Sequence, residues 1–269
     1  MTRVIVHAGF HKTGTTTVQK FLTRNGKHIW PHSAIVIQPR ISHALQMATS
    51  YSGGTGQLFL DEFYHRFCDF LGSLDLGTKR HLCISAENLC GFIPGKNDQI
   101  LNYKYSPQLL KTAVECIKDV IDPDPQLTLY FSTRDKGDWL RSLWSHNVRK
   151  NRLTEGLNEF SNRIGAVCDL ENTIAEINAM LPGYPVITSS LEKTTTEEFG
   201  PATPIINLLD LPEDTKSRLR TIAPENVSSP IHLAEKMLAL NRSAISNSAL
   251  KERKAALFNQ AGSNRKTRN

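Results

Sequence analysis

The sequence has few cysteines, and no two of them form a Cys-x-x-C pair. Only five occur among the 269 residues. This odd, scattered set argues against a complete framework of intrachain disulfides, and a chain of this length can bury a large core without one. The nine histidines also include no His-Glu-x-x-His or comparable spacing of metal ligands. We therefore expect reduced cysteines and no bound metal ion.

Long apolar segments are absent as well. The longest apolar runs, such as residues 127–131, are far shorter than the roughly 20 residues that cross a bilayer. The first residues run straight into a strand-like segment without the apolar stretch of a signal peptide. These features predict a protein with no membrane span, in a cytoplasmic setting.

Neither sign of charge is in strong excess. Lys and Arg together number 32 and Asp and Glu 26, which gives a net charge of +6. This mild excess suits an anionic ligand without the strongly basic balance that favours nucleic acid. We expect an anionic small molecule, and no nucleic acid, as a partner.

Short apolar segments alternate with amphipathic ones along the chain. The strand-like segments are residues 4–7, 34–37, 81–85, 127–133 and 185–189. Helical periodicity predicts helices at residues 18–22, 57–74, 107–121, 139–150, 157–181, 205–211 and 231–241. This alternation indicates an α/β fold of three α/β/α layers around a central parallel sheet. Without a repeat or long linker, it predicts one domain at residues 1–261 and a basic, disordered tail at 262–269.

A Gly- and Thr-rich loop follows the first predicted strand. Gly9 and Gly14 have the G-x-x-x-x-G spacing of a phosphate-binding loop, in which backbone N–H groups and the following helix end hold an anion. In enzymes that use nucleoside triphosphates, a Lys follows the second Gly and a Ser or Thr then binds Mg²⁺. Here Thr15 occupies the Lys position, and the lysine of the loop is Lys12. The loop is therefore expected to hold a phosphate without the usual ATP–Mg²⁺ apparatus.

A second candidate anion site follows the strand at residues 127–133. Arg134 comes at its end, and Ser142 follows eight residues later in the first turns of the next predicted helix. Because the carboxyl ends of parallel strands share one edge of a sheet, Arg134 should face the same crevice as the loop. A guanidinium and a hydroxyl near a helix start bind a phosphate monoester well. The two anion sites therefore suit one ligand.

Together, these motifs resemble those of the sulfotransferases that use 3′-phosphoadenosine 5′-phosphosulfate (PAPS), in their bacterial, carbohydrate-modifying branch. The segment Lys-Thr-Gly-Thr-Thr is similar to the family's 5′-phosphosulfate loop, and Arg134 with Ser142 matches its Arg-x7-Ser signature for the 3′-phosphate. The resemblance covers about residues 4–241. It implies a P-loop nucleoside triphosphate hydrolase-like fold, PAPS as donor, its product PAP, and no metal. The donor-binding residues that it implies are Lys12, Thr13, Gly14, Thr15, Thr16, Arg134 and Ser142.

Sulfuryl transfer to a hydroxyl needs a base for the acceptor proton. Glu87 follows the strand at residues 81–85 directly and should emerge at the ligand edge, so it is the first candidate. His11, inside the loop, is the second candidate. Glu87 has the alternative role of capping the following turn or pairing with a lysine, and His11 that of a supporting hydrogen-bond donor. The resemblance implies that Lys12 contacts the oxygen that bridges phosphorus and sulfur, which makes Lys12, Glu87 and His11 the catalytic set.

The resemblance implies a sulfotransferase that acts on a hydroxyl or amine of a small-molecule or glycan acceptor. Two alternatives stay open. One is a P-loop kinase for a small molecule, which Thr15 disfavours, and the other is a nucleotide-binding module without activity. Four further residues, His7, Trp139, Trp144 and Phe160, are expected to pack in the core.

Overall fold

Five parallel strands form the central sheet of this computed structural model, which describes residues 2–54, 56–77, 81–222 and 231–266. In chain order they are β1 (Arg3–His7), β2 (Ser33–Ile37), β3 (His81–Ser85), β4 (Gln126–Thr133) and β5 (Val186–Ser190). Their order across the sheet is β2-β3-β1-β4-β5, and all four pairings are parallel. The predicted α/β fold with a parallel sheet is confirmed, and each expected strand is present.

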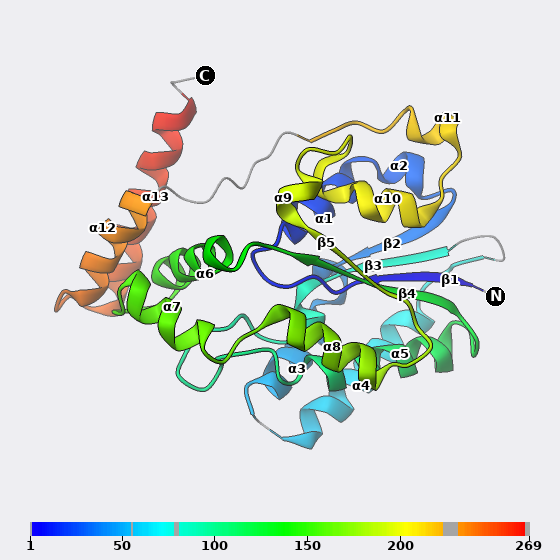
Figure 1. The fold of residues 1–269 in the computed structure, drawn as a ribbon, viewed down its shortest axis with the longest axis horizontal. Coiled ribbons are helices and arrows are strands. Elements are labelled where there is room, and N and C mark those ends of the chain that lie inside the picture. Colours follow the sequence, from blue (N-terminus) through cyan, green and yellow to red (C-terminus); the bar gives the residue numbers. More distant parts are fainter. Residues whose placement is uncertain (1, 55, 78–80, 223–230, 267–269) are drawn as a thin grey trace.

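Helices cover both faces of this sheet (Figure 1). Because successive strand residues point to opposite faces, Val4 and Val6 of β1 pack on one side and Ile5 on the other. The side of Val4 carries α3 (Ser42–Ser52), α4 (Gln57–Gly72), α5 (Ser106–Val120) and α8 (Leu170–Met180). The side of Ile5 carries α1 (Thr15–Arg24), α2 (Gly26–Ile29) and α10 (Thr203–Leu209). The sheet is thus the middle of three layers.

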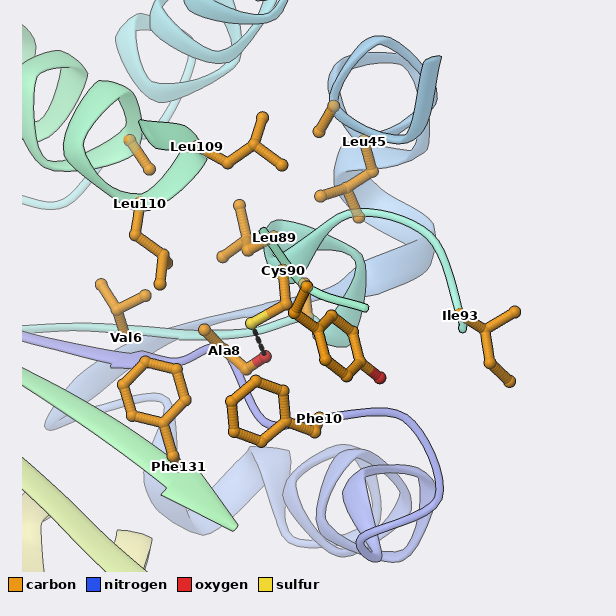
Figure 2. Packing of buried hydrophobic residues seen from close by; sticks show 14 of the residues in the cluster. Val6, Ala8, Phe10, Leu45, Leu89, Cys90, Ile93, Leu109, Leu110 and Phe131 are labelled. Carbon is orange, nitrogen blue, oxygen red and sulfur yellow. Dashed lines mark hydrogen bonds between the residues drawn. The ribbon is translucent and has the colours of Figure 1, made fainter. Parts of the chain in front are cut away.

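The first of these cores extends directly beneath the loop that follows β1. Figure 2 shows Ala8 and Phe10 of this loop among Leu109 and Leu110 of α5 and Phe131 of β4. Cys90 donates a hydrogen bond from its Sγ to the carbonyl oxygen of Ala8 over 3.3 Å. These apolar contacts fix the start of the loop against the sheet.

The remaining elements are mostly short. They are η1 (Gln38–Ile41), η2 (Glu87–Cys90), α6 (Lys136–Lys150), α7 (Leu157–Gly165), α9 (Leu191–Thr194), η3 (Gly200–Ala202), α11 (Glu213–Lys216), α12 (Ile231–Arg242) and α13 (Asn247–Lys266). Among the described residues, no helix is long and apolar enough to cross a membrane. Residues 262–266 of the predicted tail belong to α13, and residues 267–269 lie outside the described residues.

The single helix predicted at residues 157–181 is wrong, because the chain forms α7 and α8 there. The side chain of Asp169 accepts hydrogen bonds from the N–H groups of Glu171 and Asn172 and so caps a new helix. Cys168, just before it, is buried. A capping aspartate with a buried neighbour starts α8 on a new axis.

The helices α12 and α13 dock on the C-terminal end of α6. Lys254 of α13 donates hydrogen bonds from its Nζ to the carbonyl oxygens of Val148 (2.6 Å) and Asn151 (2.8 Å). Asn241 of α12 donates from its Nδ2 to the carbonyl oxygen of Val148 (3.1 Å). The last carbonyl groups of a helix have no partner within the helix, so these side chains satisfy them. Burial lowers the pKa of Lys254 to about 8.

Candidate functional site

The loop between β1 and α1 has a tight, locally strained backbone. Lys12 has a φ of +72°, in the left-handed region that few side chains occupy. Gly14, with a φ of +99°, is the N-cap of α1 and offers that helix no side-chain cap. A Cβ atom on Gly9 would lie 2.5 Å from Cγ2 of Thr15 and 2.8 Å from Nε2 of His7, so only glycine fits there. The loop therefore wraps closely around an uncapped helix N-terminus, whose N–H groups favour an anion.

Side chains from β4 and α6 hold this loop from within. The Thr13 hydroxyl donates to the carbonyl oxygen of Phe10 over 2.6 Å and lies 2.7 Å from Oγ of Ser132. Trp139 donates from its Nε1 to the carbonyl oxygen of His11 over 2.9 Å. Thr13 is fully buried, so its hydroxyl fixes the loop from the interior instead of facing a ligand. Trp139, Trp144 and Phe160 are buried, which confirms their predicted place in the core.

A cavity of about 440 Å³ opens beside the loop, at the carboxyl edge of the sheet. The residues that line it come from the loop and α1, from η2 and residue 93 after β3, from the end of β4, from α6, from the chain that runs from α9 to η3, and from residues 221–222. Of the residues predicted for the site, those that line the cavity are His11, Lys12, Gly14, Thr15, Thr16, Glu87, Arg134 and Ser142. The topology therefore brings together both predicted anion sites and the first-choice base.

Three cations line this cavity, and none of them forms an ion pair in the described part of the chain. They are Lys12, Arg134 and Arg149. Burial, and then the charges of Arg149 and Arg134, lower the pKa of Lys12. The Nε atom of Arg134 is buried without a hydrogen-bond partner among the described residues. Cations that form no ion pair within the described residues favour an anionic ligand.

Carboxylates share the cavity with these cations. Glu87 is the first residue of η2, and its Oε2 accepts a hydrogen bond from Nε2 of Gln19 over 2.8 Å. It does not cap η2, whose N-cap has no side-chain hydrogen bond in the described residues. Glu197 and Glu198, on the chain after β5, also line the cavity. Among the described residues, Glu87 therefore lies in the cavity, does not cap η2 and forms no ion pair with a lysine, and its role as a base stays a prediction.

His11, the second candidate base, has both ring nitrogens engaged. Its Nε2 lies 2.9 Å from Oδ1 of Asn88, and its Nδ1 lies 3.1 Å from the hydroxyl of Tyr103. The Tyr103 hydroxyl accepts a hydrogen bond from the His11 N–H group and can therefore donate its own proton to Nδ1. Burial is the main cause that lowers the pKa of His11. A neutral His11 with Nε2 protonated satisfies all of these contacts and leaves no free nitrogen for an acceptor proton.

His7 lies directly behind the loop and is fully buried, as predicted. Its Nδ1 lies 2.8 Å from Oγ of Ser85 on β3, and its Nε2 lies 3.5 Å from Oγ of Ser132 on β4. Burial lowers the pKa of His7 from the ordinary 6.5 to about 3. The residue is a neutral core histidine that joins three adjacent strands.

Two cavity residues on α6, His146 and Arg149, escaped the sequence predictions. They follow Ser142 by four and seven residues, so all three lie on one helical face. That spacing is the signal that could have found them. The Nδ1 atom of His146 is buried without a partner among the described residues. Burial, followed by the charges of Lys12 and Arg149, lowers the pKa of His146 to about 3.

No cluster of three or more His, Cys, Asp or Glu side chains suited to a metal ion occurs within the described ranges. Comparison of the chain with protein-family models, with curated proteins and with solved structures gives no match. A function can therefore be argued only from the residues that line the cavity.

Proposed function

We propose that the chain is a PAPS-dependent sulfotransferase with a P-loop fold. The observation that carries this proposal is one cavity in which a glycine loop, an uncapped helix N-terminus and three cations meet, none of the cations having an ion pair within the described residues. PAPS carries a 5′-phosphosulfate and a 3′-phosphate, so it needs two anion sites on one surface. Lys12 with the N-terminus of α1 supplies one of them, and Arg134 with Ser142 supplies the other.

The residues present fit this donor in their chemistry. Residues Gly14 to Thr16 offer backbone N–H groups at the helix start, where a 5′-phosphate is favoured. Arg134 donates from its Nη1 to the carbonyl oxygen of Lys12 over 3.3 Å, while its buried Nε has no acceptor among the described residues; a phosphate oxygen supplies one. A kinase of the usual P-loop type needs a lysine where Thr15 stands, so the donor set favours a phosphosulfate over ATP with Mg²⁺.

Bound PAPS supplies an activated sulfuryl group. An acceptor hydroxyl or amine attacks the sulfur and displaces PAP as the leaving group. The ammonium of Lys12 stabilises the negative charge that develops on the leaving phosphate oxygen. Glu87 takes the proton of the acceptor, while Gln19 holds its Oε2 in place. His11 ties the loop to η2 through Asn88 and positions Lys12, its neighbour in the chain. The acceptor in this proposal is a small molecule or a glycan.

Ligand-dependent thermal stability tests the donor assignment. A ligand that binds only the folded protein stabilises it by mass action, by about 2.7 kcal/mol at a concentration of 100 times its Kd. We expect PAP to raise the Tm of the wild type and ATP with Mg²⁺ to raise it little. Lys12→Met should weaken the PAP effect, whereas Lys27→Met, an exposed lysine of α2 outside the cavity, should leave it unchanged. A larger shift with ATP and Mg²⁺ would point to the kinase and end the proposal.

Turnover separates the enzyme from a module that only binds the nucleotide. Transfer of radiolabelled sulfate from PAPS should be found in a screen of hydroxyl and amine acceptors, and Lys12→Met should abolish it. EDTA should leave this activity intact. A protein that binds PAP tightly but transfers no sulfate to any acceptor class would be the binding module.

A further inference from the structure

The pocket-facing side of α6 continues beyond the proposed 3′-phosphate site. Ser142 lies in the first half of this helix, and Arg149 follows seven residues later, about 10 Å along the helix axis. Arg134, the partner of Ser142, precedes the helix. Arg149 therefore lies at the opposite end of α6 from the proposed 3′-phosphate site, yet it lines the same cavity.

The guanidinium of Arg149 is held in place but has no anionic partner in the described chain. It stacks over the ring of Phe258 on α13, with 4.9 Å from its Cζ to the ring centroid. Stacking covers one face of the planar group and leaves its N–H edge for another ligand. His146 lies one turn earlier on the same face of α6 and is half-buried. Its Nδ1 atom is buried and has no hydrogen-bond partner among the described residues. Both side chains thus offer hydrogen-bonding capacity that the described protein does not use.

The frame around Arg149 is rigid. Lys254 and Asn241 bind the carbonyl groups at the end of α6, so α12 and α13 fix the helix at the turn that carries Arg149. Figure 1 shows these two helices beside α6. A binding group whose supporting contacts fix its position loses little entropy when it binds a ligand. This is the arrangement that a specific anion subsite requires.

We propose that Arg149, with His146 beside it, binds a carboxylate of the acceptor, so the acceptor carries both a carboxylate and the group that receives sulfate. A guanidinium matches a carboxylate by two parallel hydrogen bonds. The proposal rests on the proposed function, because Lys12, Arg134 and the start of α1 then serve the donor and leave Arg149 to the acceptor. It makes acidic sugars and hydroxy acids better acceptors than their neutral counterparts.

Calorimetric titration of two tetrasaccharides tests this subsite. Hyaluronan tetrasaccharide carries glucuronate, and the same tetrasaccharide with its carboxylates reduced to hydroxymethyl groups is its neutral counterpart. With PAP-saturated wild type, we expect the acidic probe to bind at least about tenfold more tightly than the neutral one. Arg149→Gln should remove this preference. Arg141→Gln removes the same charge from the same helix at an exposed site outside the cavity and should keep the preference.

Measuring the PAP affinity of each variant distinguishes an acceptor role of Arg149 from a donor role. Arg149→Gln with unchanged PAP affinity and no preference for the acidic probe supports the subsite and shows that the fold is intact. Loss of PAP binding in this variant would assign Arg149 to the donor and overturn the proposal. Equal binding of the two probes by the wild type, including no detectable binding of either, would also overturn it, as would a preference that Arg149→Gln retains.

Failure of the donor assignment gives a different result. If the wild type does not bind PAP, the proposed function fails, and the same titration on the ligand-free protein still decides the subsite. An Arg149-dependent preference would then show a carboxylate site in a protein of another activity.

Discussion

Acidification should destabilise this protein through His7, which is buried between β3 and β4. The pKa of His7 is about 3 in the folded protein, whereas an ordinary histidine of the unfolded chain has a pKa of 6.5. Between these values the unfolded chain binds a proton that the folded protein does not, so unfolding takes up a proton and stability falls as the pH decreases. From pH 7 to pH 5, this linkage removes about 2 kcal/mol of unfolding free energy for the one group.

The substitution His7→Asn isolates this contribution. Asn places a polar atom near the position of the imidazole Nδ1, which lies 2.8 Å from the hydroxyl of Ser85, but it does not titrate. The variant should be less stable than the wild type at pH 7, because Asn fills less of the buried site. The difference in unfolding free energy between the variant and the wild type should then shrink by about 2 kcal/mol at pH 5, because only the wild type loses the His7 contribution.

Urea unfolding followed by circular dichroism, at pH 7, 6 and 5, measures both proteins under identical conditions. The carboxylates that titrate in this range are common to both and cancel in the difference. Parallel pH profiles for wild type and His7→Asn would refute the reasoning, since His7 would then accept its proton within the folded core.

Three further predictions concern the cavity. Arg134→Ala should weaken PAP binding by about 2 to 4 kcal/mol in calorimetry while the far-UV spectrum stays that of the wild type; equal affinity would remove Arg134 from the site. Glu87→Gln should lower kcat by about 10² to 10⁴ with PAP affinity unchanged; near-normal turnover would show that Glu87 is not the base. Gly9→Ala should reduce stability by about 1 to 3 kcal/mol and weaken PAP binding, since its Cβ would lie 2.5 Å from Thr15. The control is Gly26→Ala, because no atom lies within 4 Å of the new Cβ. A Gly9→Ala protein as stable as the control would show that the loop is looser than the structure has it.

The features that the sequence predicted correctly are those with local causes. Each strand is a short apolar run that needs no knowledge of its neighbours, because parallel strands are buried on both faces. The tight glycine loop between β1 and α1 is equally local, since two glycines and one lysine define its pattern within six residues; that it binds a phosphate stays a prediction. Arg134 and Glu87 could be placed at the ligand edge because both directly follow strands, and strand ends share that edge.

The features that sequence analysis missed depend on contacts between distant segments. The hydroxyl of Thr13 turns inward because Ser132 meets it from 119 residues away. His146 and Arg149 belong to the cavity only because α6 turns one particular face toward the loop, and their spacing alone does not say which face that is. The break between α7 and α8 is the exception, because its cause is local: a single capping aspartate, Asp169, competes with the helical pattern on both sides.

The docking of α13 on α6 has a consequence for the order in which the protein is completed during synthesis. Lys254 follows Val148, whose carbonyl oxygen it binds, by 106 residues. At translation rates of about 5 to 20 residues per second, roughly 5 to 20 s separate the two on the ribosome. During that interval the glycine loop and its neighbouring strands already exist, but Arg149 lacks the ring of Phe258 and the end of α6 lacks its partners. The nascent chain therefore holds the glycine-loop side of the cavity before it can fix the wall that carries Arg149.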